Sequence, residues 1–297
     1  MSAMNIAMVV NPAARSGAHT HAATRATDRL RELGHTVTLI SGGSAGESSS
    51  LIRTAVELGT DALVVAGGDG TINLALQHLA GTGVPLGIVP AGTGNDFAMH
   101  LGIPQLEPDT AADVIAAGRT RTIDLARVTA DDGGARLYAT VLASGFDSFV
   151  NDRANRMRWP RGDMRYNIAI LVEFLFLRPS PYAIEVDGRR IDGPFVMASV
   201  GNTRSYGGGI PICPTADETD ALLDVTVVRP AGRLRLLRLL PTVYKGTHTE
   251  RKEVETFRGR TVRLDAVGIT AYADGDPIGS LPLTIDVLPA ALTVLVP

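Results

Sequence analysis

The sequence predicts an α/β fold in which an N-terminal nucleotide-type domain with a parallel sheet is followed by a mostly antiparallel, β-rich domain. Two observations support this prediction. The first ~125 residues alternate short apolar runs with helical patterns, as chains with parallel sheets do. After about Leu125, runs that alternate apolar with polar residues dominate, and turn signals such as Asp187-Gly188 separate them. We therefore predict domains at residues 1–125 and 126–297.

The N-terminal strands are short apolar runs, and helical patterns with apolar residues three or four positions apart follow them. Because parallel strands end at the same edge of their sheet, the turns after these strands should lie together. The expected strands are Ile6–Val10, Thr36–Ile40, Asp61–Ala66 and Leu86–Val89, and the expected helices are Ala18–Leu33, Ser48–Leu58, Thr71–Ala80, Asn95–Leu101 and Thr110–Ala117.

The second half is expected to be mainly strands, interrupted by the helices Met164–Leu177 and Leu234–Tyr244. Further turn signals are Asp132-Gly133-Gly134 and Asp274-Gly275. The expected strands are Arg136–Leu142, Tyr182–Val186, Phe195–Val200, Leu222–Val228, Thr261–Leu264, Ile269–Ala273, Leu283–Val287 and Leu292–Val296.

Composition excludes several classes of protein. A net charge of −3 and a pI near 6.1 argue against a nucleic-acid binder. Cys213 is the only cysteine, so an intramolecular disulfide and a cysteine metal cluster are excluded, and we expect its side chain to be buried. The apolar run Ile6–Val10 is too short for a signal peptide, and Ile168–Leu177 is too short for a membrane span. We therefore expect a cytoplasmic protein.

Three turns leave the carboxyl ends of expected parallel strands: Asn11-Pro12 through Gly17, Gly67 through Thr71, and Pro90 through Asp96. Glycine turns before helices offer free backbone N–H groups to anions, and ligands bind at this edge of an α/β sheet. Gly-Lys occurs nowhere in the sequence, which excludes a P-loop. Asp69 at the apex of the second turn repels phosphate, so it needs another role.

These motifs resemble those of the bacterial diacylglycerol kinase-type lipid kinases, from Ile6 to Val296. The N-terminal part of the resemblance is GGDGT at Gly67–Thr71 with Asn73, and PAGTGNDFA at Pro90–Ala98. GGDGT is shared with NAD kinases, whereas GTGNDFA with a late Asp-Gly-acid turn is more specific to the lipid kinases. The members downstream are Gly207-Gly208-Gly209, Cys213-Pro214, Leu223-Asp224, Tyr244-Lys245-Gly246-x-His248 and Asp274-Gly275-Asp276-Pro277.

The resemblance implies ATP as phosphoryl donor, Mg²⁺ beside it, and an active site between a nucleotide domain and a lipid domain. The glycine N–H groups would take the phosphates, while Asp69 would serve the metal and the proton transfer. The implied acidic network is Asp69, Asp96, Asp124, Asp274 and Asp276. The implied nucleotide-binding residues are Asn11, Pro12, Ser16, Gly17, Ser41, Gly67, Gly68, Asp69, Gly70, Thr71, Asn73, Thr93, Gly94 and Asn95.

Two details of the implied site stay open. The general base is one of Asp69, Asp274 and Asp276, and the family commonly has Glu where this chain has Asp276. By the same resemblance, Asp220 would bind a structural Mg²⁺ with the carbonyls of Asp217 and Leu222. Ala221 stands where the family usually has Gly, and the alternative is a solvated acidic loop.

Diacylglycerol is the first acceptor that the resemblance implies, followed by sphingoid bases, ceramide and glycolipids. The resemblance is also compatible with a homodimer. A basic amphipathic helix at Arg233–Leu240 fits contact with an anionic membrane surface. We expect Leu236, Leu237, Leu240 and Val243 to form its apolar stripe, with Arg235 and Arg238 pointing away. The alternative is a helix that packs on the β-rich domain with solvated arginines.

Three alternative functions compete with a lipid kinase. An NAD kinase-like enzyme for a soluble substrate shares GGDGT. A serine hydrolase is supported by one motif: Gly42-Gly43-Ser44-Ala45-Gly46 fits G-x-S-x-G, and His248 lies downstream as a possible base. The third is a lipid-binding module that has kept the fold without the activity.

Overall fold

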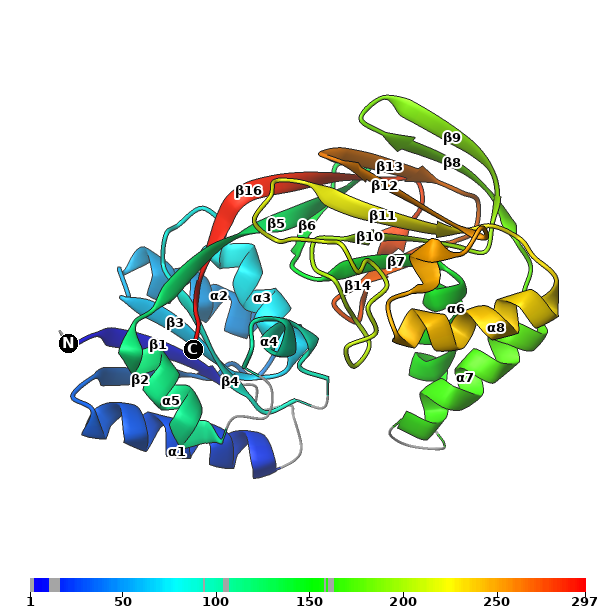
Figure 1. Ribbon diagram of the computed structural model, residues 1–297. Helices are drawn as coiled ribbons and strands as arrows, with labels where there is room; N and C mark the ends of the chain where they lie inside the picture. Colours follow the sequence, from blue (N-terminus) through cyan, green and yellow to red (C-terminus); the bar gives the residue numbers. More distant parts are fainter. Residues whose placement is uncertain (1–2, 11–16, 93, 104–106, 158, 160–162) are drawn as a thin grey trace. The chain divides into compact units, whose positions relative to one another are not determined.

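The computed structural model describes residues 3–10, 17–92, 94–103, 107–157, 159 and 163–297. The chain divides into two compact units (Figure 1). Unit 1 comprises Met1–Leu125, Gly207–Gly209 and Leu288–Pro297, and unit 2 comprises Ala126–Tyr206 and Ile210–Val287. The C-terminal segment thus groups with unit 1, because the last strand of the chain pairs there.

Unit 1 is built on a parallel sheet with the strand order β2-β1-β3-β4. These strands are β1 (Asn5–Val10), β2 (Thr36–Ile40), β3 (Ala62–Gly67) and β4 (Leu86–Pro90). Every residue of β3 is buried, as expected for a central parallel strand covered on both faces. The end of β16 (Leu283–Leu295) extends this sheet, where Val294 pairs with Leu86 of β4 in the parallel sense.

Helices cover both faces of this sheet (Figure 1). α1 (Gly17–Glu32) and α5 (Pro108–Ala117) pack together through alanines, which let the two helices approach closely. α2 (Ala45–Glu57) and α3 (Asp69–Leu79) pack together elsewhere on the sheet, and α4 (Asp96–His100) is a short helix after β4. α2 begins three residues earlier than expected, because Ser44 caps it by accepting a 3.2 Å hydrogen bond from the Glu47 N–H.

Unit 2 contains two antiparallel layers with a shared core. One layer has the order β12-β11-β10-β7-β14-β15, and in the other β16 pairs with β13, β13 with β8, and β8 with β9. Its strands are β6 (Ala135–Tyr138), β7 (Val141–Gly145), β8 (Ser180–Val186), β9 (Arg189–Phe195), β10 (Met197–Gly201), β11 (Leu223–Val228), β12 (Val254–Gly259), β13 (Thr261–Asp265), β14 (Thr270–Ala273), β15 (Asp276–Ser280) and parts of β5 (Thr120–Ala130) and β16. The first six residues of β5 belong to unit 1.

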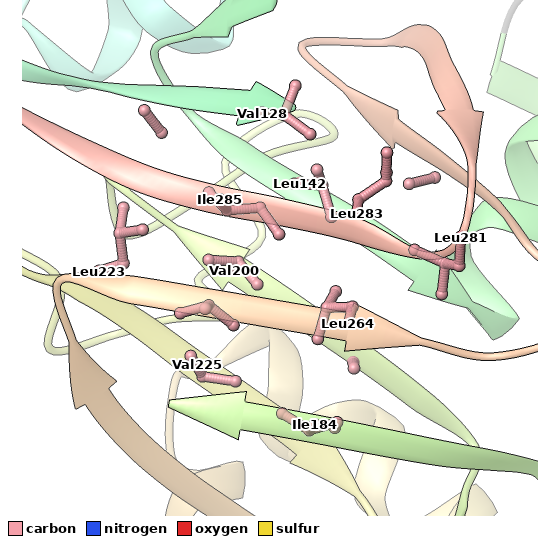
Figure 2. Packing of buried hydrophobic residues seen from close by; sticks show 14 of the residues in the cluster. Val128, Leu142, Ile184, Val200, Leu223, Val225, Leu264, Leu281, Leu283 and Ile285 are labelled. Atoms are coloured by element: carbon pink, nitrogen blue, oxygen red, sulfur yellow. The ribbon is translucent and has the colours of Figure 1, made fainter. Parts of the chain in front are cut away.

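The core of unit 2 lies between these layers. Figure 2 shows Leu142, Val200 and Val225 from one layer among Ile184, Leu264 and Ile285 from the other. Residues of opposite parity in the first layer, such as Val141 and Met197, face a second core beneath the helices. These helices are α6 (Phe146–Arg156), α7 (Asp163–Leu175) and α8 (Arg233–Tyr244), and a short 3₁₀ helix, η1 (His248–Glu250), follows α8.

Three sequence-based expectations differ from the structure. Arg136–Leu142 is not one strand but parts of β6 and β7, which belong to different layers. Leu283–Val287 and Leu292–Val296 are not two strands, because β16 continues through Ala290 at a left-handed φ of 50°. In α8, Leu237 is exposed and Leu239 takes the buried place beside Leu236. Within the described residues, no helix is long and apolar enough to cross a membrane.

Candidate active site

The glycine turns after β3 and β4 lie against each other at the carboxyl edge of the unit 1 sheet. The Ala91 N–H donates to the Gly67 carbonyl at 3.1 Å, which joins the two turns directly. A Cβ atom at Gly92 would lie 2.5 Å from the Gly68 Cα, and one at Gly68 would lie 3.0 Å from the Gly92 Cα. These glycines are therefore required by the close approach of two backbones.

Asp69 is the first residue of α3, and its carboxylate faces the start of α4. Its two oxygens accept from the backbone N–H groups of Asp96 at 3.3 Å and Phe97 at 3.4 Å. A negative charge is favourable at a helix N-terminus, where backbone N–H groups lack partners within the helix. Asp69 thus links the two glycine turns, a contact that answers why a carboxylate stands at this apex.

Asn95 shapes the second turn. Its backbone is left-handed, with φ 58°, a conformation that asparagine tolerates better than most residues. Its side-chain oxygen accepts from the Gly92 N–H at 3.1 Å, and its amide nitrogen donates to the Gly92 carbonyl at 2.9 Å. The turn is therefore closed before α4 begins.

Asp96, the first residue of α4, is held by the triple-glycine segment. Its carboxylate accepts from the Gly208 N–H at 2.7 Å and the Gly209 N–H at 3.0 Å. Gly207, Gly208 and Gly209 all have positive φ values, of 59°, 84° and 86°, which only glycine adopts readily in succession. The sequence motif included these glycines without showing what they contact.

The other implied nucleotide residues of unit 1 follow the same strands. Ser41 is exposed directly after β2, Thr71 is buried in the first turn of α3, and Asn73 lies two residues further along this helix. Gly17 begins α1 after β1. Gly70 follows Asp69 in the chain and Gly94 lies two residues before Asp96, whereas Asn11, Pro12, Ser16 and Thr93 lie outside the described residues.

Asp124 is buried in β5 and accepts from the Ala290 N–H at 2.8 Å. Ala290 is the left-handed residue of β16, so this carboxylate holds the strand at its irregular point. This contact joins Asp124 to β16 within unit 1, and its implied part in the acidic network stays a prediction.

Asp274 and Asp276 stand at the β14–β15 turn of unit 2. The Asp274 backbone is left-handed, with φ 50°, and its carboxylate accepts from the N–H groups of Ala139 at 3.1 Å and Thr140 at 3.0 Å, and from the Thr140 hydroxyl. The side chain of Asp276 is exposed. Desolvation first, and the charge of Asp274 second, raise the pKa of Asp276, while Arg136 opposes them.

The loop predicted to bind a structural metal contains an ion-pair network. One oxygen of Asp220 accepts from the Leu222 N–H at 3.0 Å, and the Arg258 guanidinium contacts the other. The same guanidinium donates to Asp224 at 3.0 Å. Ala221 keeps the left-handed backbone, with φ 58°, although it is not glycine. Within the described residues, no cluster of three His, Cys, Asp or Glu side chains is placed to hold a metal ion.

Sequence reasoning missed a half-buried acid–phenol pair in unit 2. Asp147, in the first turn of α6, accepts from the Tyr206 hydroxyl. Burial raises the pKa of Asp147 to about 6, and the Tyr206 bond opposes this shift. Tyr206 directly precedes the triple-glycine segment, and its backbone bridges to Ile210 on the other side of that segment. α6 has a largely polar sequence with little apolar periodicity, so neither the helix nor Asp147 could be predicted from the sequence.

The two polar residues that a serine hydrolase would need have structural partners. Ser44 caps α2 in unit 1, as described above. His248 is fully buried in unit 2, and its Nε2 lies 3.0 Å from the Ile212 carbonyl. Cys213 is buried as expected, and burial raises its pKa to about 12.

The fold is thus a parallel α/β unit with paired glycine turns, followed by an antiparallel unit with a carboxylate turn. Residues 5–128 match the family described as "Diacylglycerol kinase catalytic domain", and residues 140–296 match "YegS C-terminal NAD kinase beta sandwich-like domain". The chain belongs to the diacylglycerol kinase-like lipid kinase family, and it is a kinase with an alcohol group as acceptor.

Relatives of known name agree with this assignment. The chain is 50% identical to "Diacylglycerol kinase" of Mycobacterium tuberculosis over 293 residues, which cover 98% of this chain and 95% of the relative. It is 29% identical to "Probable lipid kinase YegS" of Escherichia coli, over 90% and 89% of the two chains. A putative diacylglycerol kinase structure from Bacillus anthracis has the same fold, with a TM-score of 0.82, 21% identity and coverage of 99% and 95%.

Proposed function

We propose that this protein transfers the γ-phosphoryl group of ATP to a lipid hydroxyl with Mg²⁺, and that the acceptor is diacylglycerol, giving phosphatidic acid. The observation that carries the proposal is the joined pair of glycine turns, with Asp69 bridging them at the carboxyl edge of the sheet. The M. tuberculosis relative named diacylglycerol kinase, 50% identical over nearly the full length, supports this choice of acceptor.

The reaction needs few covalent steps from the protein. The acceptor hydroxyl oxygen forms a bond to the γ-phosphorus, the bond from that phosphorus to the β–γ bridging oxygen breaks, and ADP leaves. The hydroxyl proton passes to a carboxylate, for which we propose Asp274, with Asp69 and Asp276 as the alternatives. Magnesium supplies positive charge to the phosphate oxygens when it is bound.

Carboxylate oxygens are ligands that Mg²⁺ prefers, and a carboxylate can take the proton of an acceptor hydroxyl. Asp69 and Asp274, each held in direction by backbone N–H groups, are therefore the carboxylates that we propose for these roles. At the second metal site we propose that the Asp220 carboxylate and the carbonyls of Asp217 and Leu222 hold the ion. There the ion must share Asp220 with Arg258.

A lipid panel tests the proposed function. The full chain is incubated with labelled ATP, Mg²⁺ and detergent-dispersed diacylglycerol, sphingosine, ceramide or glycolipid, with NAD in a separate reaction. We expect labelled phosphatidic acid, and no product after chelation of Mg²⁺. Another labelled lipid would replace diacylglycerol as the acceptor, whereas NADP with no labelled lipid would overturn the proposal in favour of an NAD kinase-like enzyme.

A further inference from the structure

α8 is apolar on two opposite sides. Leu236 and Leu239 are buried in the helix-covered core of unit 2. On the other side, Leu234, Leu237 and Tyr244 are 72%, 51% and 60% exposed. Their spacing of three and seven residues places them in one row along the helix. Surface helices normally turn polar residues outward, so this outward row calls for a second apolar contact.

α7 carries a similar outward row. Leu171 and Leu175 lie one turn apart and are 59% and 51% exposed, while Ala169 of the same helix is buried. Met164 is also exposed and lies seven residues before Leu171, on the same side of the helix. Single exposed leucines are common on protein surfaces, whereas aligned apolar residues on two helices indicate an interaction site.

The two rows meet. Arg233, the first residue of α8, donates to the Leu175 carbonyl at the end of α7, at 3.1 Å. Residues of both helices also pack on one core: Leu236 and Leu239 lie within it, and Ile170 and Phe174 pack against it. Figure 1 shows the end of α7 close to the start of α8 in unit 2. We call the joined surface of Leu171, Leu175, Leu234, Leu237 and Tyr244 the α7–α8 patch.

The surroundings of the α7–α8 patch are basic. α8 contains no acidic residue, and Arg238 and Lys245 lie along the border of its outward row. Within the part of the chain that the structure describes, neither makes an ion pair. The nearby acids Glu173 and Glu253 face Arg153 and Arg235, which leaves the balance of charge positive. Apolar side chains bordered by basic ones fit a bilayer surface with anionic headgroups.

We propose that the α7–α8 patch is the surface by which this protein docks on an anionic lipid bilayer, an inference that rests on the proposed function and assigns it a membrane-binding face. Symmetric pairing of two copies through this patch would bring like charges together. The charge of the patch therefore favours a bilayer over a second copy as its occupant.

Vesicle sedimentation tests the proposal with the full chain. Leu234→Ser/Leu237→Ser removes apolar contact, and Arg238→Gln/Lys245→Gln removes charge. The matched control is Leu58→Ser, because Leu58 is 82% exposed at the end of α2 in unit 1. All four side chains are exposed, so melting temperatures should stay near wild type.

We expect the wild type to bind phosphatidylcholine vesicles that contain phosphatidylglycerol more tightly than vesicles of phosphatidylcholine alone. The leucine pair should weaken binding roughly tenfold or more. The basic pair should weaken it about fivefold per residue, at about 1 kcal/mol each. The Leu58 control should bind as wild type does. If the leucine pair binds like this control, the proposal is overturned.

Two further measurements separate the outcomes. Light scattering that shows a dimer lost in the leucine pair, with vesicle binding intact, would overturn the proposal in favour of self-association. Phosphorylation of detergent-dispersed dioctanoylglycerol should be alike in wild type and both variants. If the wild type bound vesicles but phosphorylated no lipid, the proposed function would be refuted, while the docking role of the α7–α8 patch would not be. Lipid phosphorylation without vesicle binding would refute the patch alone.

Discussion

Asp69, Asp96 and Asp274 share one property at the scale of single residues: backbone N–H groups from another segment hold each carboxylate. The Asp96 contact joins residues 112 positions apart, and the Asp274 contacts join residues 134 and 135 positions apart. N–H donors fix the direction of a carboxylate before any ligand arrives, which is the preorganisation that phosphoryl transfer needs. Sequence spacing cannot reveal such contacts, because they depend on how distant segments pack.

Asp274→Asn should mainly affect the chemical step. The substitution nearly preserves volume but removes the charge that takes the acceptor proton in the proposed mechanism, and loss of a general base costs about 10²–10⁴-fold in kcat. Thr140→Val is the matched variant, because it deletes one donor to Asp274 and keeps the carboxylate. Steady-state kinetics should show a far larger loss in Asp274→Asn than in Thr140→Val. Similar losses of kcat in the two variants would mean that Asp274 only holds the β14–β15 turn against residues 139 and 140.

Asp147 should make stability depend on pH. Burial raises the pKa of Asp147 from 3.8 to about 6, so the folded chain holds this proton more tightly than the unfolded chain. Its contribution is fully present below about pH 4 and is lost as the pH rises to about 6, up to about 3 kcal/mol in all. In Asp147→Asn this fall should disappear from urea unfolding curves between pH 4 and 6. Asp152→Asn, on the same helix, should keep the wild-type fall, and an unchanged fall in Asp147→Asn would exclude Asp147 as its source.

At the scale of elements, the two glycine turns act as a pair, and Gly92→Ala should separate them. The added Cβ would lie 2.5 Å from the Gly68 Cα, so one backbone must move. Overpacking of this kind costs about 1–3 kcal/mol, and a displaced turn should also weaken ATP binding. Gly46→Ala is the control, since a Cβ at this helical position of α2 meets nothing within 4 Å. Thermal unfolding and nucleotide titration should show both effects in Gly92→Ala alone; equal behaviour of the two variants would contradict the packing argument.

How well elements could be predicted depended on their local pattern. β3 is a continuous apolar run, and its sequence predicts a buried strand within one residue of its observed bounds. α6 was missed because charged and polar residues make up most of FDSFVNDRANR, which leaves little apolar periodicity. The run Arg136–Leu142 alternates like one strand, yet Ala139 and Thr140 leave the strands to donate to Asp274. Tertiary contacts overrode the local pattern at these places.

At the scale of the whole molecule, the two units have cores that support different parts of the proposed function. In unit 1, the core lies beneath the glycine turns, and in unit 2 a sandwich core and a helix-covered core support the carboxylate turn and the α7–α8 patch. The motifs of the sequence indicated the turns of both units. The outward rows of α7 and α8 could not be predicted, because a leucine-rich helix has the same sequence whichever side it buries.

Two ligands should therefore leave two separate footprints in hydrogen exchange. A Mg²⁺ complex of a non-hydrolysable ATP analogue should slow exchange in residues 67–73 and 94–100, because ordering of the glycine turns lowers local opening. Vesicles with phosphatidylglycerol should slow exchange in residues 164–176 and 233–245 instead. The β8–β9 hairpin is the internal reference, and neither ligand should protect it. If vesicles protected the glycine turns and left α7 and α8 unchanged, the membrane contact would belong to unit 1. If the nucleotide protected the hairpin as much as the turns, its effect would be general stabilisation without a defined site.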